Sequence, residues 1–197
     1  MRVLVGCEES GKVRDAFRAL GHDAWSCDLV MSRSSNVYHY QMDVVKAITH
    51  YGPWDIIILH PDCTAMAVSG NRWYGKGMPQ HVGRLVALDW TAHLWEMAKQ
   101  TARIGCAIEN PVSVLWNRIG KPQYIQPYQF GHGETKATGI LTHKLPPLLP
   151  TNLVDGREQR VWKMPPGPNR KRDRSETFQG IADAMASQWG QVLEFAV

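Results

Sequence analysis

The sequence has no long hydrophobic run and no signal peptide. No stretch approaches the roughly 20 consecutive apolar residues that cross a bilayer. The N-terminus, MRVLVGCEESGKV, reaches charged residues after only a few apolar ones, which is not the pattern of a secretion signal. We therefore expect a cytoplasmic protein that makes no contact with a membrane.

Disulfide and metal-binding patterns are missing as well. The four cysteines (Cys7, Cys27, Cys63 and Cys106) are widely spaced and form no Cys-x-x-Cys pair. The eight histidines do not pair at metal-ligand spacing. This usage favours buried thiols or one nucleophilic cysteine over a disulfide framework or a zinc site, so no metal is predicted.

The composition is that of a globular domain. Of the 197 residues, 44% are hydrophobic and 20% are charged, close to the averages for soluble domains. These values exclude a largely disordered chain, a coiled coil and a collagen-like repeat. The length suits one domain with at most an appended arm.

The net charge of +4 is unevenly distributed. Residues 157–174 carry seven basic and two acidic residues, whereas the rest of the chain has 15 basic and 16 acidic ones. This excess lies in a Pro-rich arm at 151–175 that includes Arg170, Lys171 and Arg172. The arm is either a solvated loop or an element that contacts phosphates.

Strand-like and helix-like patterns alternate along the chain. We expect a helix at 10–21 with Ser10 as its N-cap, and a helix at 84–103 with Leu85 on its apolar side. Residues 69–83 contain four glycines and no periodicity, so we expect a mobile loop there. The expected strands lie at 2–6, 22–28, 54–60 and 104–111. This alternation predicts an α/β fold with a mostly parallel sheet.

Polar clusters follow four of the expected strands. They lie at 6–9, at Asp28, at 60–64 and at 109–111. The carboxyl ends of parallel strands meet at one edge of a sheet, and ligands of α/β proteins bind outside that edge. The sequence therefore predicts a functional site that these clusters share.

Two of these residues suggest covalent chemistry. Cys63 directly follows a buried strand, where it is either a nucleophile or a small buried apolar residue, and a nucleophilic role requires activation of the thiol. Glu109 ends another strand, and a carboxyl group beside a nucleophilic cysteine can hold a substrate ring. On cytosine one carboxyl group can engage both N4 and N3, and charge stabilised at N3 makes C6 open to attack by a thiolate.

These segments resemble motifs of the cytosine-5 DNA methyltransferases. WDIIILHPDCTAM resembles their Pro-Pro-Cys-Gln segment, AIENP resembles their Glu-Asn-Val segment, and FQGIADAMASQWG resembles their closing Gly-Asn-x-Val helix. The motifs occur in the family's order over most of the chain, which most resembles short phage-type members. The resemblance implies a bacterial or phage-encoded protein and a single catalytic domain over 1–197. It also implies a Rossmann-like S-adenosylmethionine-dependent methyltransferase fold with helices on both faces of the sheet.

The same resemblance assigns a cofactor site. LVGCEESG stands where the family's glycine loop cradles S-adenosylmethionine; Gly6 matches, but Glu8 and its neighbour replace paired glycines. Asp28 stands where an acid binds the ribose hydroxyls, and Asp43 where an Asp contacts the adenine amino group. The predicted cofactor-binding residues are Gly6, Cys7, Glu8, Asp28, Asp43, His60 and Pro61, although His60 could instead orient a phosphate or cap its strand.

The resemblance also implies a mechanism. Cys63 adds to C6 of cytosine, Glu109 binds N3 and N4, and C5 takes the methyl group of S-adenosylmethionine. Asn110, which holds Glu109 in place, is counted with these catalytic residues. Lys136 stands in for an Arg that steadies the nucleotide, or it is an ordinary surface lysine.

The substrate is open at this point. Residues 112–174 are long enough only for loops, so we expect no separate target-recognition domain. The basic arm and the loop around Arg72 and Trp73 therefore have to grip single-stranded DNA, a flipped-out base or a free cytosine nucleotide; Trp73 could instead pack a lid over the cofactor. An amino-methyltransferase and a non-catalytic nucleic-acid-binding relative that has lost the cofactor are further alternatives.

Overall fold

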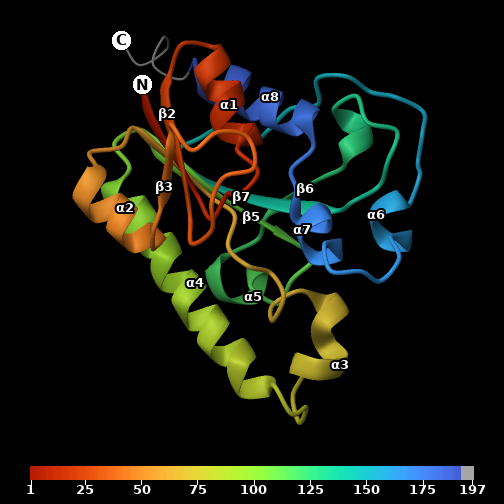
Figure 1. Cartoon of the computed structure of the whole chain (residues 1–197). Helices are drawn as coiled ribbons and strands as arrows, with labels where there is room; N and C mark the ends of the chain where they lie inside the picture. Colours follow the sequence, from red (N-terminus) through yellow and green to blue (C-terminus); the bar gives the residue numbers. More distant parts are fainter. Residues whose placement is uncertain (192–197) are drawn as a thin grey trace.

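Seven strands form one sheet in the order β3-β2-β1-β4-β5-β7-β6 (Figure 1). The computed structural model describes residues 1–191. Strands β1 to β5 are parallel, and β7 runs antiparallel to both β5 and β6. The strands are β1 (Arg2–Gly6), β2 (Asp23–Asp28), β3 (His39–Gln41), β4 (Ile56–Leu59), β5 (Gly105–Pro111), β6 (Gln123–Ile125) and β7 (Thr138–His143).

Helices cover both faces of this sheet. On one side, Val3 and Val5 of β1 belong to a core shared with α1 and α8, and on the other side Leu4 belongs to a core shared with α2, α4 and α5. The helices are α1 (Lys12–Ala19), α2 (Val44–Tyr51), α3 (Asn71–Tyr74), α4 (His81–Thr101), α5 (Trp116–Ile119), α6 (Arg160–Lys163), α7 (Arg170–Ser175) and α8 (Gln179–Trp189), with 3-10 turns at Val68–Gly70 and Pro127–Gln129. The predicted mostly parallel sheet with helices on both faces is confirmed.

The register of the central strands aligns the polar clusters. Every residue of β4 is buried, as expected for a parallel strand that is covered on both faces. Leu59 at its end pairs with Gly6 of β1 and with Ile108 of β5. The residues that follow Gly6 and Leu59 therefore leave the sheet beside Glu109, which follows Ile108 and remains within β5, paired with β7.

The segment expected to be a loop at 69–83 is largely helical. It contains α3, and α4 begins at His81 rather than at 84. The buried face of α4 also differs from the prediction, since Arg84 is buried while Leu85 is 48% exposed. Figure 1 shows the start of α4 projecting away from the sheet, so periodicity alone does not reveal which part of the helix is covered.

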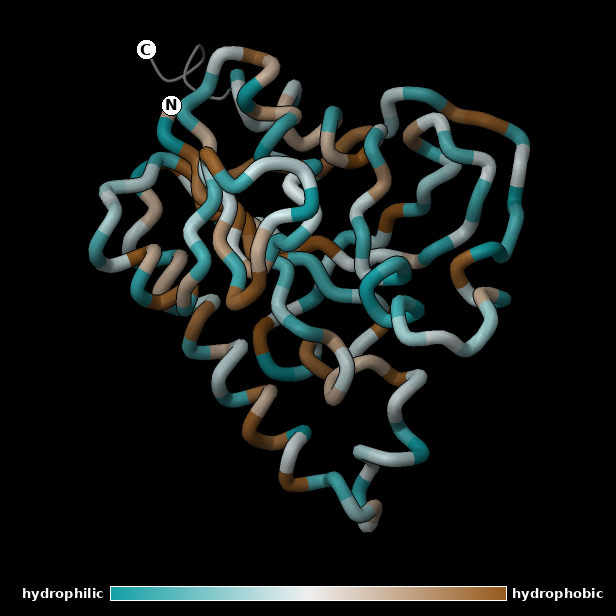
Figure 2. Tube along the Cα trace, in the orientation of Figure 1, coloured by the Kyte–Doolittle hydropathy of each residue, from teal (hydrophilic) through white to brown (hydrophobic). Residues whose placement is uncertain are grey.

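The stretch at 112–174 is more structured than expected. It supplies β6 and β7 to the sheet, so it consists of more than loops. Within the basic arm, α6 and α7 are two short helices. Figure 2 shows α7 as a hydrophilic segment. Among residues 1–191, no helix combines the length and the apolar character needed to cross a membrane.

Candidate active site

Backbone hydrogen bonds join the loops that leave the sheet edge. The amide of His60 donates to the carbonyl of Gly6 (2.9 Å), and the amide of Glu8 donates to the carbonyl of Cys27 (3.0 Å). Next along the chain, the carbonyl of Cys63 accepts from Met66 (3.0 Å) and from the following residue, which forms a turn. The turn holds the Cys63 sulfur close to the end of β4.

The Cys63 thiol lies among charged groups. Burial raises its pKa to about 11 with the help of the carboxylates of Glu109 and Asp62, while Lys136 acts in the opposite direction. Cys63 lies in the loop after β4, Glu109 in β5 and Lys136 in the loop before β7, so the fold brings these three predicted site residues together. A thiol with this pKa is protonated at neutral pH and needs a cationic neighbour or a base before it can attack.

Glu109 is a largely buried acid whose side chain faces His60. Its side chain is 16% exposed, and Nδ1 of His60 lies 3.4 Å from its Oε2. Burial raises the pKa of Glu109, but the hydrogen bond from His60 and the charges of Lys136 and His60 outweigh burial and bring the pKa below its usual value. The carboxylate is therefore ionised at neutral pH.

Lys136 is not an ordinary surface lysine. Burial lowers its pKa, against the attraction of Glu109 and Cys63. Its Nζ donates to the backbone carbonyl of Glu176 (3.2 Å). The lysine thereby connects the candidate catalytic pair to the segment between α7 and α8.

Asn110 and Pro61 form a hydrogen bond that holds the Cys63 loop to β5. Asn110 is fully buried, and its Nδ2 donates to the carbonyl of Pro61 (3.3 Å). This contact connects the end of β5 to the loop that carries Cys63. In the geometry observed, both residues fix the loop.

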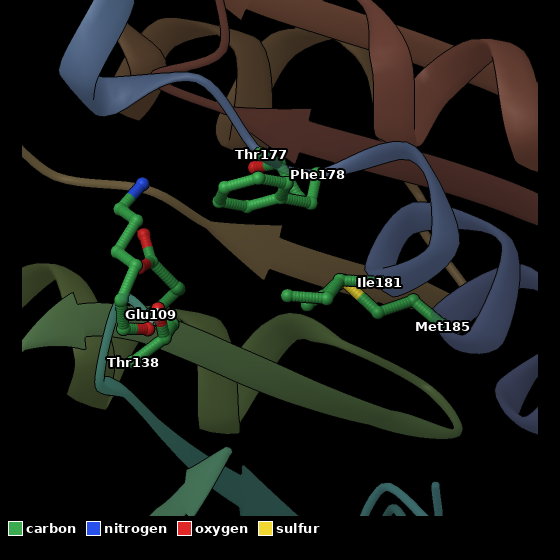
Figure 3. A pocket seen from close by; sticks show the side chains of 7 residues that line it. Glu109, Thr138, Thr177, Phe178, Ile181 and Met185 are labelled. Atoms are coloured by element: carbon green, nitrogen blue, oxygen red, sulfur yellow. Dashed lines mark hydrogen bonds between the residues drawn. The ribbon is translucent and has the colours of Figure 1, made fainter. Parts of the chain in front are cut away.

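A small cavity adjoins Glu109 (Figure 3). Its volume is about 10 Å³, which is the space that one water molecule needs. Glu109 and Thr138 lie on its sheet side, and Thr177 and Phe178 come from the segment before α8. The remaining lining residues are Lys136, Ile181 and Met185.

Acidic groups surround the loop after β1. Cys7 adopts a left-handed backbone conformation with φ 60°. Burial raises the pKa of its thiol, as do the nearby Asp28 and Asp43. A Cβ on Gly6 would lie 2.6 Å from Cγ2 of Val44, so glycine is required there for close packing of β1 against α2. Residues 6, 7, 28 and 43 thus lie near one another at this edge of the sheet.

Glu8 has a structural partner that the sequence did not reveal. Its carboxylate accepts from the amides of Val13 (2.7 Å) and Arg14 (3.3 Å) and so satisfies the open N–H groups at the start of α1. The N-cap residue is Gly11 rather than Ser10 as expected, although Oγ of Ser10 accepts from the amide of Lys12, the first residue of α1 (3.3 Å). Burial raises the pKa of Glu8 against these hydrogen bonds and the charge of His60.

The aromatic segment after Cys63 is exposed. Trp73 is 51% exposed on α3, and the guanidinium of Arg72 lies 4.8 Å from the centre of its ring. Buried Arg84 on α4, which the sequence analysis missed, donates to the carbonyl of Ala65 (2.7 Å) and to Oδ1 of Asn71 (2.9 Å). It therefore holds this segment in place.

The basic helix α7 lies beside the candidate nucleophile. Nζ of Lys171 forms an exposed ion pair with Oδ2 of Asp62 (2.9 Å). Arg170 donates from Nε to the carbonyl of Met164 (2.7 Å), and Arg172 is exposed. Arg174, which the sequence analysis did not single out, is close enough to Cys63 for the two groups to influence each other's charge.

Glu176 was also missed. Its carboxylate pairs with Lys12 (2.5 Å) and with Arg33 (3.0 Å), which lie after β1 and β2 respectively. Its carbonyl accepts from Lys136. No local pattern in the sequence indicates these long-range contacts. In the part of the chain that the structure describes, no group of His, Cys, Asp or Glu side chains is arranged to hold a metal ion.

Comparison with known proteins identifies the fold. The chain is similar to the crystal structure of a proposed DNA modification methyltransferase that is encoded within a prophage of E. coli, with a TM-score of 0.53 and 13% sequence identity. The match covers 78% of this chain and 52% of the other, so this chain spans about half the length of that protein. No family model and no curated protein matches the chain. The predicted α/β fold is confirmed, and this solved structure shares it.

Proposed function

We propose that this protein is an S-adenosylmethionine-dependent cytosine C5-methyltransferase that acts on DNA. The observation that carries the proposal is the convergence of Cys63 with Glu109 and Lys136 at the ends of neighbouring strands. The fold shared with a proposed DNA modification methyltransferase is consistent with it.

Each of the three residues has a task in this reaction. The Cys63 thiolate forms a bond to C6 of cytosine, while Glu109 binds the N4 amino group and stabilises charge at N3. Lys136 favours the thiolate electrostatically. The adduct is nucleophilic at C5; after methylation, loss of the C5 proton and cleavage of the S–C6 bond free Cys63.

The loop after β1 and its acidic neighbours suit the cofactor. When bound, S-adenosylmethionine supplies an electrophilic methyl group. Its ribose hydroxyls and its adenine amino group are hydrogen-bond donors, and its sulfonium is cationic. The carboxylates of Asp28 and Asp43 would accept hydrogen bonds from these donors and attract the sulfonium. Asp28 accepts a backbone hydrogen bond from Val30 (3.3 Å) and Asp43 one from Val45 (2.9 Å), through Oδ1 in each case.

Entry of a base requires movement near Phe178. A cavity of about 10 Å³ beside Glu109 is far too small for a pyrimidine ring. Thr177 and Phe178 form one wall of this cavity, and α7, which precedes them in the chain, is held to the Cys63 loop by the Lys171–Asp62 ion pair. An exposed ion pair is worth at most about 1 kcal/mol, so DNA phosphates can compete with Asp62 for Lys171.

The direct test is methyl transfer from radiolabelled S-adenosylmethionine. We expect label in DNA, recovered after digestion as 5-methylcytosine, and no label in free cytosine nucleotide. Label in the nucleotide alone would contradict DNA as the substrate. Label at the exocyclic N4, or none in either substrate, would contradict C5 chemistry.

Neutralising the basic helix tests the contact with DNA. Substituting Arg170, Lys171 and Arg172 by Gln should weaken DNA binding and reduce the slope of log K against log salt by up to about 3, because each lost phosphate contact removes about 0.9. Fluorescence anisotropy over a salt series measures this. The control substitutes three other exposed lysines by Gln and loses the same charge; they are Lys46, Lys121 and Lys144. Equal slopes for the two variants would contradict a role of α7 in binding DNA.

A further inference from the structure

His60 occupies a buried position between two acids. Its side chain is 9% exposed, and its Nδ1 faces Oε2 of Glu109 at 3.4 Å. Its charge also acts on the buried carboxylate of Glu8. Among the described residues, Nε2 of His60 is buried without a hydrogen-bond partner. A buried ring nitrogen with no partner is costly, so packing alone does not explain a histidine at this position.

The proposed chemistry leaves a proton unaccounted for. N3 of cytosine is an acceptor, and an ionised carboxylate is also only an acceptor. The carboxylate of Glu109 can therefore hold the N4 amino group but has no proton to give to N3. Its pKa lies below the usual value, so solvent at neutral pH does not protonate it efficiently.

We infer that His60 is a positioning residue that acts through Glu109, supplying from Nδ1 the proton that Glu109 delivers to N3 when Cys63 adds to C6. This inference rests on the proposed function. As the S–C6 bond forms, the electrons of the C5=C6 bond move into a C4=C5 bond and those of C4=N3 take up the proton at N3. On elimination the S–C6 bond breaks and the N3 proton returns through Glu109 to His60. The thiol proton and the C5 proton leave to water.

Several charged groups face this pair. Glu8 approaches from the loop after β1 and Lys136 from the segment before β7. Asp62 and Cys63 lie on the same loop as His60. None of these can replace the contact that His60 makes with Oε2 of Glu109, since only His60 donates to that carboxylate among the described residues.

The test compares His60→Asn with the wild type over pH 5 to 8.5. The Asn amide can reach the position of Nδ1 and donate to Glu109, but it cannot release a proton. We expect kcat to fall by about 10²-fold at pH 7 with the KM for S-adenosylmethionine unchanged. The deficit should shrink several-fold for each unit of acidification, because solvent then protonates Glu109 directly. His50→Gln, an exposed histidine on α2, serves as the control and should match the wild type.

A titration without substrate gives an independent readout. The hydrogen bond and charge of His60 lower the pKa of Glu109, so the Glu109 carboxyl followed by ¹³C NMR should titrate at higher pH in His60→Phe than in the wild type. An unchanged midpoint overturns the inference, as does a loss in His60→Asn that is equal at every pH. Both results leave methyl transfer by the wild type intact. Absence of methyl transfer in the wild type instead overturns the proposed function.

Discussion

Cys63→Ala is expected to abolish methyl transfer by at least about 10⁴-fold while S-adenosylmethionine binds almost as tightly as before. In the proposed mechanism the sulfur forms the bond to C6, and among residues 1–191 no other thiol is placed to do so. Cys27 and Cys106 are buried in the core, and Cys7 lies among Asp28 and Asp43 on the predicted cofactor side. Radiolabel transfer measures the first effect and calorimetry the second.

Trapping separates a covalent role of Cys63 from a structural one. DNA that contains 5-fluorocytosine cannot lose a proton from C5, so the wild-type enzyme should remain attached to it in the presence of S-adenosylmethionine. The adduct should be absent in Cys63→Ala and should form normally in Cys106→Ala, which removes a thiol from the core of β5. Adduct formation by Cys63→Ala, or a large loss of cofactor affinity, would place Cys63 in another role.

The sequence contained enough information to predict the convergence of Cys63 and Glu109. A fully apolar strand such as β4 indicates burial on both faces and hence a parallel sheet. Once β4 and β5 are parallel neighbours, the end of β4 has to lie beside β5, and Leu59 at that end pairs with Ile108, the residue before Glu109. The prediction succeeds because the pairing of the backbones alone determines which residues of neighbouring strands lie side by side.

Contacts that depend on side chains from distant segments were not predictable. Glu176 joins Lys12 and Arg33 across more than 140 positions of the chain, and nothing near residue 176 indicates either partner. Glu8 was assigned to the cofactor loop from its position, yet it accepts hydrogen bonds from the amides at the start of α1. The sequence does not reveal the role of Arg84 on α4. Its Nε donates to the backbone carbonyl of Ala65, and this carbonyl comes within reach only when the Cys63 loop is folded.

Glu109→Gln should lower methyl transfer by about 10²- to 10³-fold, because a Gln amide cannot stabilise charge at N3 or pass on a proton. The same substitution should make Cys63 more reactive. The carboxylate of Glu109 contributes to the raised pKa of the thiol, so its removal increases the thiolate fraction at pH 8. Alkylation of Cys63 by iodoacetamide, followed by mass spectrometry, should therefore be faster in the variant than in the wild type.

The opposite signs of these two effects distinguish catalysis from misfolding. Glu134→Gln provides a matched control, since Glu134 is equally buried and is paired with Arg160; it should change neither rate.

Stability gives a third readout. The pKa of Glu109 is lowered in the folded protein, so its ionised form stabilises the fold above the unfolded pKa, and this contribution disappears as the pH falls through the folded value. The difference in unfolding free energy between the wild type and Glu109→Gln should therefore be largest at neutral pH and shrink on acidification. Slower alkylation together with lost activity would mean that Glu109 and Cys63 do not share one site.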